Sequence, residues 1–301
     1  MAPTWTIRRL LAWMAEDFGN LGIGTPRLDA ELLIAHVLEL DRVRLYMDLD
    51  RPLSTAELSA LRALVARRRL REPVAYLIGR REFYRRPFAV SPAVLIPRPD
   101  TETLVERALA LLPPDQPARA LDLCTGSGAI AITLAAERPE LQVDATDLSP
   151  AALELARNNA ETLGGTERIQ FYEGDLFAAL PGGARYRLIA ANPPYVPTGE
   201  LPGLAPELRH EPQLALAAGA DGLDALRRLC AGVADWLEPG AALLFEVGQG
   251  QAPAVLELLG RVPELHALQA HRDLGGIERV VEARRVGIPE SAPPDPAPEN
   301  A

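Results

Sequence analysis

A four-residue segment, Asn192-Pro193-Pro194-Tyr195, holds the residue types in this chain that are best suited to chemistry. It follows an apolar stretch of strand length at 186–191, so the Asn side chain should stand at the carboxyl end of a buried strand, where open α/β sheets bind ligands. The two prolines stiffen the backbone and donate no backbone hydrogen bonds, which leaves the local carbonyls free to accept. The Asn192 side-chain oxygen and the Pro193 carbonyl can hold two N–H donors of a planar amine or amide, while Tyr195 packs on its flat face. The segment therefore predicts a site that aims a planar nitrogen at an electrophile, although an ordinary proline-rich strand exit would contain the same four residues.

A glycine loop follows an earlier predicted strand at 120–123, and it consists of Cys124, Thr125, Gly126, Ser127 and Gly128. Its two glycines let the backbone turn tightly and approach a ligand at the N-terminus of the next helix. Asp147 ends the second predicted strand, where its carboxylate can accept hydrogen bonds from two ribose hydroxyls. Residues 126–131 also match the looser Gly-x-Gly-x-x-Ala dinucleotide pattern, so the loop alone leaves nicotinamide and S-adenosylmethionine both open.

Residues after the third predicted strand, 169–172, distinguish between these two cofactors. Asp175 can accept a hydrogen bond from an adenine amino group there, and Leu176 and Phe177 would line the adenine ring. The four histidines are scattered, and none stands near the carboxyl edge of the sheet to handle a hydride. Together with the planar-nitrogen site, these residues favour a methyltransferase that uses S-adenosyl-L-methionine and releases S-adenosyl-L-homocysteine.

Composition sets limits on partners and location. A chain of 301 residues has room for one catalytic domain and a smaller one, and its net charge of −10 argues against a protein that coats nucleic acid. Its two cysteines fit neither a disulfide framework nor a metal site, so we expect no metal and a reducing, cytoplasmic location. Charges at Arg8, Arg9, Glu16 and Asp17 exclude a signal peptide or membrane span at the N-terminus. We expect a monomer without a nucleic-acid substrate.

The pattern along the chain predicts four parts. Residues 1–78 read as a helical bundle that docks the substrate, 79–97 as a β-hairpin linker, 98–286 as the catalytic domain and 287–301 as a disordered tail. Ser54 and Glu57 predict a capping box for the third helix. An Arg-dense stretch after that helix, which includes Arg68 and Arg69, is either a solvated face near a domain junction or a docking surface for an acidic or RNA-associated partner.

Strands and helices alternate from Ala118 onward, which is typical of a mostly parallel, doubly wound α/β sheet. The predicted elements include a helix from Thr103 to about Leu112, a helix capped by Ser149 and stopped by Gly164, a helix at roughly 224–237 and a strand at 241–247. The last two strands, near 265–272 and 279–284, are too close in sequence for a crossover helix, so they should pair antiparallel. This arrangement resembles the seven-stranded, Rossmann-like methyltransferase sheet, whose last strand is antiparallel.

Two resemblances narrow the activity. Asn-Pro-Pro-Tyr is the signature of S-adenosylmethionine-dependent methyltransferases that act on exocyclic amines of bases or on glutamine amides. The further motifs, in their order after a helical N-terminal domain, resemble the HemK-type release factor glutamine methyltransferases from about Pro26 to Arg285. They are the hairpin and Ile-Pro-Arg-Pro-Asp-Thr-Glu loop at 79–102, His210-Glu211-Pro212, the segment 219–223, and Phe245-Glu246-Val247-Gly248.

The second resemblance implies methyl transfer to the glutamine amide in the Gly-Gly-Gln motif of class I peptide chain release factors. Asp100 departs conservatively from the Glu that is usual in this family. The glycine loop and the His-Glu-Pro motif also resemble sister enzymes that methylate a glutamine of a large-subunit ribosomal protein, although the Ile-Pro-Arg-Pro loop favours release factors. A non-catalytic docking module with a vestigial cofactor fold is a further alternative, against which the intact site residues argue.

Overall fold

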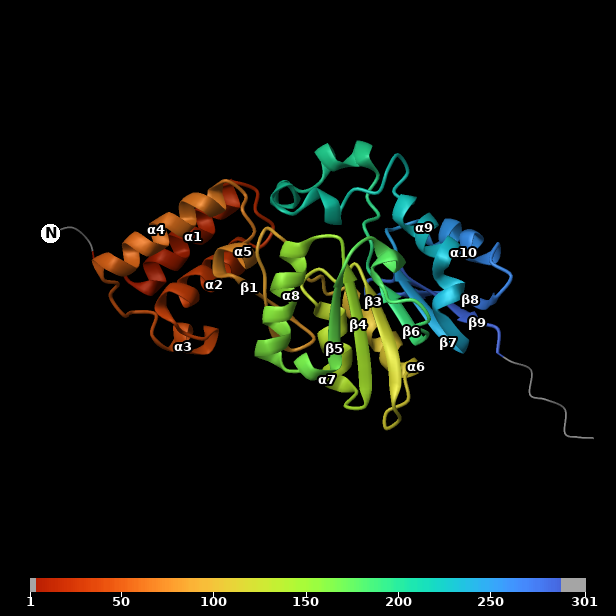
Figure 1. The fold of residues 1–301 in the computed structure, drawn as a ribbon. Coiled ribbons are helices and arrows are strands. Elements are labelled where there is room, and N and C mark those ends of the chain that lie inside the picture. The colour runs from red at the N-terminus through yellow and green to blue at the C-terminus, as the bar shows by residue number, and fades with distance from the viewer. Residues whose placement is uncertain (1–3, 288–301) are drawn as a thin grey trace, which may run out of the picture.

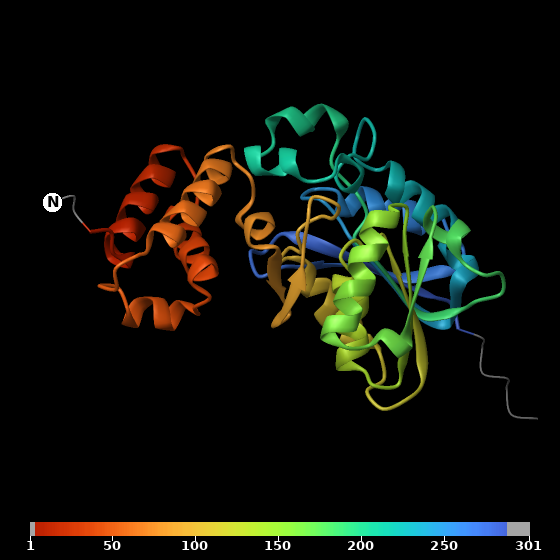
Figure 2. The ribbon, with the colours of Figure 1, turned by 60° about the vertical axis from the view of Figure 1, so that its left-hand side comes forward.

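The computed structural model describes residues 4–287, and it places a bundle of short helices beside a sheet with helices on both faces (Figures 1 and 2). The predicted tail at 287–301 lies almost wholly outside the described residues. Within the described part of the chain, no helix is long and apolar enough to cross a membrane.

The helical bundle forms because each of its helices has a clear start and an apolar side. Ser54 caps α4 as predicted: its side chain accepts from the Glu57 backbone N–H, and the Glu57 side chain accepts from that of Ser54. Pro26 occupies the first position of α2, where its missing N–H costs no helical bond. Met14, Phe18, Leu33 and other apolar residues form a core of the bundle's own. The helices are α1 (Ile7–Asn20), α2 (Pro26–Leu38), α3 (Arg42–Met47), α4 (Thr55–Arg69) and α5 (Val74–Ile78).

A short hairpin joins the bundle to the sheet domain. Its strands, β1 (Arg80–Phe83) and β2 (Arg86–Ala89), pair antiparallel around Tyr84 and Arg85. Both turn residues have positive φ, 46° and 61°, as a two-residue hairpin turn of the primed type requires. The Tyr84 backbone N–H donates to the Glu102 side chain at 2.8 Å, which fixes the strained turn to the next helix.

The sheet confirms the predicted fold class. Its seven strands run in the order β5-β4-β3-β6-β7-β9-β8, and only β9 runs antiparallel to its neighbours. The last strand in sequence therefore inserts between β7 and β8. The strands are β3 (Ala118–Leu123), β4 (Leu141–Asp147), β5 (Ile169–Glu173), β6 (Tyr186–Ala191), β7 (Leu237–Glu246), β8 (Leu265–Arg272) and β9 (Glu278–Arg285).

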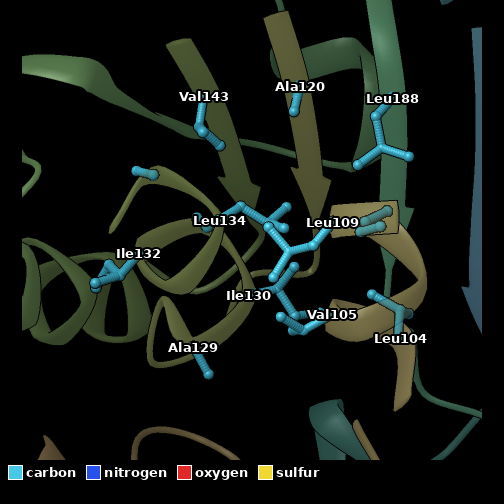
Figure 3. Close-up of a cluster of buried hydrophobic side chains, with 14 of the residues drawn as sticks. Leu104, Val105, Leu109, Ala120, Ala129, Ile130, Ile132, Leu134, Val143 and Leu188 are labelled. Atoms are coloured by element: carbon cyan, nitrogen blue, oxygen red, sulfur yellow. The ribbon is translucent and has the colours of Figure 1, made fainter. Parts of the chain in front are cut away.

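Helices cover both faces of this sheet, and alternate residues of each buried strand face one or the other layer. One face packs on α6 (Thr101–Leu111), α7 (Ala129–Glu137) and α8 (Pro150–Leu163), and the other on α9 (Asp224–Gly232) and α10 (Ala252–Gly260). Figure 3 shows the first layer, where α6 side chains meet Ile130 and Leu134 of α7 against Ala120, Val143 and Leu188 of three strands.

Two predicted boundaries were wrong. The helix expected at 224–237 ends at Gly232 and continues as a 3-10 turn, Val233–Trp236, so β7 begins at Leu237 and not at Ala241. Helix α6 begins at Thr101, two residues before the expected start, because the chain already turns at Arg98–Asp100 through backbone bonds from Thr101 and Glu102.

A long insertion between β6 and α9 connects the two domains. Its described form is three short 3-10 helices, Thr198–Gly203, Pro206–His210 and Gln213–Ala215, which lie above the sheet edge near the helical bundle (Figures 1 and 2). Glu207 of the insertion accepts from Arg68 at 2.9 Å and from Arg71 at 3.0 Å. His210 lies 3.0 Å from the Leu70 carbonyl.

These contacts correct the docking interpretation of Arg68. Its side chain is only 4% exposed, and it also donates to buried Asp29 at 2.9 Å. Arg68 is therefore a structural link between the domains and offers no charge to a partner, whereas Arg69 is about half exposed and pairs with Asp17.

Replacing Arg68 with Ala should destabilise the protein by about 3 kcal/mol, because the buried Asp29 carboxylate loses its ion-pair partner. Urea unfolding followed by tryptophan fluorescence would measure this, since Trp5 and Trp13 lie in the helical bundle. Arg69→Ala is the matched control and should cost less than about 1 kcal/mol, as exposed ion pairs do. Equal losses for the two variants would contradict a special role for Arg68.

Candidate active site

The carboxyl ends of β3, β4, β5 and β6 meet at one edge of the sheet because these four strands are adjacent and parallel. A cavity of about 340 Å³ lies at this edge. Its walls include residues from the end of each of these strands, from the Ile-Pro-Arg-Pro loop and from the insertion after β6. Among the predicted site residues, the cavity is lined by Cys124, Thr125, Gly126, Ser127, Asp147, Asp175, Leu176, Asn192 and Pro194.

The glycine loop is held by a buried carboxylate beneath it. Asp122 accepts from the Thr125 hydroxyl at 2.6 Å and from the Ala131 backbone N–H at 3.1 Å, which joins the loop to the start of α7. Burial raises the pKa of Asp122 to about 7. Gly128 itself does not line the cavity, and its φ of 81° is the reason that glycine is favoured at this position.

Asp147 is placed to complete a cofactor site. Its two carboxylate oxygens accept from the Gly126 and Ser149 backbone N–H groups, both at 2.9 Å, which fixes the side chain beside the cavity. A carboxylate offers about four lone-pair positions, so acceptors remain for two hydroxyls. Burial also raises the pKa of Asp147.

The residues present fit S-adenosylmethionine. A Cβ added to Gly126 would meet no atom within 4 Å, so the backbone here borders open space that a ligand can approach closely. Leu148, which is 51% exposed, adds an apolar wall beside Asp147. Sequence reasoning missed Leu148, although an apolar residue directly after a strand-end Asp was a signal for it.

The third strand exit differs from expectation in two respects. Asp175 lines the cavity but also accepts from Arg228 of α9 at 2.6 Å, an ion pair that sequence reasoning did not foresee. Leu176 lines the cavity as predicted, whereas the Phe177 ring stacks on Trp236 with centroids 5.7 Å apart and is not among the lining residues. The expected contact of Phe177 with the adenine ring stays a prediction, which this stacked position does not display.

The Asn-Pro-Pro-Tyr segment is divided between the cavity and the core. Asn192 and Pro194 line the cavity, and the Asn192 side-chain nitrogen donates to the Thr101 hydroxyl oxygen at 3.2 Å. Pro193 and Tyr195 do not line it. The Tyr195 hydroxyl instead donates to buried Glu246 at 3.3 Å, so the expected clamp on the target side chain stays a prediction that this conformation does not display.

Two loops beside the cavity are bound to each other. Glu211 of the insertion accepts from the Ile96 backbone N–H at 3.1 Å and from the Arg98 side chain at 2.5 Å. The motifs that contain these residues carried the family resemblance, but sequence reasoning gave neither a role. Their contact brings the Ile-Pro-Arg-Pro loop and the His-Glu-Pro motif together beside the cavity.

The hairpin linker is connected to the glycine loop through Asn159 of α8. Its side-chain nitrogen donates to the carbonyls of Ser127 at 2.9 Å and Ala89 at 3.1 Å, and its oxygen accepts from the Ala89 N–H at 2.8 Å. Phe83 of the hairpin also reaches the cavity wall. The hairpin is thus part of the site's scaffold.

Comparisons with known proteins agree with this geometry. The family model of the PrmC N-terminal domain matches residues 9–79, and that of the methyltransferase small domain matches residues 101–212. A solved methyltransferase from Pyrococcus furiosus superposes with a TM-score of 0.51 at 16% identity, over 76% of this chain and 100% of that one, which shows the fold alone.

Curated relatives cover nearly the whole chain. The release factor glutamine methyltransferase of Geobacter sulfurreducens is 45% identical over 93% of this chain and 97% of its own length. That of Bordetella pertussis is 46% identical over 85% of this chain and 94% of its own. At this identity and coverage, the chain belongs to the release factor glutamine methyltransferase family, whose methyl donor is S-adenosyl-L-methionine.

Proposed function

We propose that this enzyme transfers a methyl group from S-adenosylmethionine to the side-chain amide nitrogen of the glutamine in the Gly-Gly-Gln motif of class I peptide chain release factors, and so modulates translation termination. The observation that carries the proposal is the orientation of the Asn192 side-chain amide at the end of β6. Its nitrogen donates a hydrogen bond to Thr101, so its oxygen can accept a hydrogen bond from a substrate in the cavity. A glutamine amide brings two N–H donors on one planar nitrogen. The names of the curated relatives favour release factors over the ribosomal-protein alternative.

The protein's part in the reaction is orientation and charge placement. An amide nitrogen is a poor nucleophile because its lone pair is delocalised into the carbonyl, and the bound cofactor supplies a strongly electrophilic methyl group on a positively charged sulfur. The Asn192 oxygen and the Pro193 carbonyl hold the two amide hydrogens, which lets the nitrogen pyramidalise. Because Pro193 does not line the cavity in the described conformation, its carbonyl must become accessible when the substrate binds. These acceptors bind the cationic nitrogen formed on attack more strongly than the neutral amide, so they lower the barrier. The methylated nitrogen then loses one proton to water, which leaves the neutral methyl amide.

With S-adenosylmethionine bound, Asp147 would accept from the ribose hydroxyls, the loop from Cys124 to Gly128 would border the methionine part, and Asp175 with Leu176 would border the adenine. All of these residues except Gly128 line the cavity, which supports this assignment. Arg228 holds the Asp175 carboxylate in the cavity wall. Release factors act on ribosomes in the cytoplasm, which is where we place the enzyme.

The helical bundle supplies the docking surface for the rest of the release factor, because a single glutamine side chain offers few atoms to recognise. A groove of about 450 Å³ lies between α1 and α4, with Trp5 and Trp13 exposed at 37% and 40%. Arg9 and Arg69 lie over these two rings, each 5.6 Å from the ring centre. An apolar groove with a basic rim fits a partner that presents an apolar side chain beside acidic ones.

The substrate assignment is tested by incubating the enzyme with labelled cofactor and purified release factor, ribosomal protein or DNA, followed by mass spectrometry. We expect label on the Gly-Gly-Gln glutamine. Label on a ribosomal-protein glutamine alone, or on DNA, would contradict the proposal.

Asn192→Ala should abolish methyl transfer while the dissociation constant for S-adenosylmethionine, measured by calorimetry, stays within a few-fold of wild type. Asn192→Asp should fail as well, because a carboxylate cannot donate to Thr101 and adds a charge beside the cofactor. Near-normal turnover by either variant would overturn the proposed role of this side chain.

Asp147→Ala should weaken cofactor binding by about 1.5–3 kcal/mol, since the ribose loses a charged acceptor and the Gly126 N–H loses its partner. Calorimetry measures the change. An unaltered dissociation constant would show that the ribose lies elsewhere. Asp115→Ala is the control and should leave the dissociation constant unchanged. Asp115 is exposed in the surface connection between α6 and β3 and does not line the cavity.

The double variant Trp5→Ala/Trp13→Ala should raise KM for whole release factor by about tenfold or more, as loss of interface tryptophans does. Turnover of a short Gly-Gly-Gln peptide should not change. Met47→Ala, an exposed apolar residue of α3 outside the groove, is the control and should affect neither substrate. Equal KM values for the double variant and wild type would place docking on another surface.

A further inference from the structure

A chain of buried polar side chains runs from the end of β7 to the cavity. Glu246, the last residue of β7, is 1% exposed, and Thr101, the first residue of α6, is 4% exposed. The Thr101 hydroxyl donates to Glu246 Oε2 at 2.6 Å, and the Asn192 nitrogen donates to the same hydroxyl oxygen at 3.2 Å. Tyr195 donates to the second oxygen of Glu246 at 3.3 Å.

The Thr101 hydroxyl determines which groups donate and which accept along this row of hydrogen bonds. A threonine hydroxyl has one proton and two lone pairs, so a proton committed to Glu246 leaves the oxygen only to accept. The short bond to a carboxylate makes this commitment strong. Asn192 can then meet Thr101 only with its NH₂ group, because its carbonyl oxygen would face a lone pair.

We infer that Thr101, held by Glu246, is a positioning residue that fixes which end of the Asn192 amide faces the cavity. The inference rests on the proposed function, in which the Asn192 oxygen accepts from the target glutamine. A reversed Asn192 would present NH₂ to a substrate NH₂, and two donors repel each other. Without the Thr101–Glu246 pair, the two orientations of Asn192 would differ little in free energy.

The Glu246 carboxylate can hold the Thr101 hydroxyl in this orientation, although burying a charged group is unfavourable. Both hydroxyls that reach Glu246 donate to it, so it serves as an acceptor on both oxygens. Burial raises the pKa of Glu246 to about 7, partly offset by the Thr101 hydrogen bond and the nearby Arg279 charge. Arg279 in turn pairs with Asp100 at 3.4 Å, which holds the residue before Thr101.

The first test compares Thr101→Val with Thr101→Ser on whole release factor. Val keeps the volume and removes the hydroxyl, so kcat should fall about 10- to 100-fold, as small misplacements of reacting groups do, with KM and the cofactor dissociation constant nearly unchanged. Ser restores the hydroxyl and should recover most of the wild-type kcat. Thr133→Val is the matched control, since Thr133 is fully buried on α7 and its hydroxyl has no partner among residues 4–287; it should leave kcat unchanged.

The second test removes the acceptor. Glu246→Leu replaces the carboxylate with an apolar group of similar size. The Thr101 proton is then free to donate to the Asn192 oxygen, so kcat should fall at least as far as in Thr101→Val. Glu246→Leu also removes the acceptor of the Tyr195 hydroxyl, so the single and double variants are compared in a Tyr195→Phe background. Because Glu246 then reaches Asn192 only through Thr101, the double variant should lose no more than the worse single variant. Additive losses, or a wild-type kcat for Thr101→Val, would overturn the inference.

A readout without catalysis separates this inference from the proposed function. The chain has five asparagines, so selective ¹⁵N labelling with an Asn192→Ala reference assigns the Asn192 side-chain signals. We expect one hydrogen-bonded Asn192 N–H proton in wild type and in Thr101→Ser, and none in Thr101→Val. If the wild-type enzyme shows this pattern but does not methylate a glutamine, the proposed function is wrong and the positioning role of Thr101 is still supported. If the Asn192 NH₂ of the wild-type enzyme is not hydrogen-bonded, the positioning role of Thr101 is wrong.

Discussion

The parallel pairing of β5, β4, β3 and β6 forces their carboxyl ends to one edge of the sheet, and the rest of the site depends on this constraint. Each strand needs only one or two polar residues at its exit for the edge to hold a complete site. Asp147, Asp175 and Asn192 occupy three such exits and the glycine loop the fourth. Each side chain is then oriented by bonds to its neighbours, as when Asp147 accepts from Gly126 of the adjacent strand's loop.

Local patterns were sufficient to predict this part of the molecule. The alternation of strand and helix, the N-cap at Ser149 and the stop at Gly164 gave α8 its observed bounds, because capping depends on a few neighbouring residues. Most predicted cofactor residues line the cavity for the same reason: the end of a strand is a local feature, and the parallel sheet fixes where it lies. Short insertions of irregular structure were harder, as the 3-10 turn after Gly232 shows.

Contacts between distant segments could not be predicted in this way. Thr101 and Glu246 are 145 positions apart, and nothing in the sequence around either shows that they meet. Arg68 appeared in an Arg-dense stretch typical of a solvated surface, yet Asp29 and Glu207 bury it. The contact of Tyr195 with a substrate stays a prediction, but the acceptor that Glu246 offers to its hydroxyl could not be predicted from the sequence around either residue.

The insertion after β6 links the helical bundle to the cavity, because one of its carboxylates is hydrogen-bonded to the bundle and another to a loop beside the cavity. Glu207 is held by Arg68 and Arg71 of the helical bundle. Glu211, four residues further along the chain, is held by Ile96 and Arg98 beside the cavity. Pro212 and Leu214 follow at once and form part of the cavity wall. A displacement of the bundle must therefore strain either the Glu207 bonds or the wall that Pro212 and Leu214 form. The helical bundle, where we propose that the body of the release factor docks, and the cavity are thus joined by a single segment of chain.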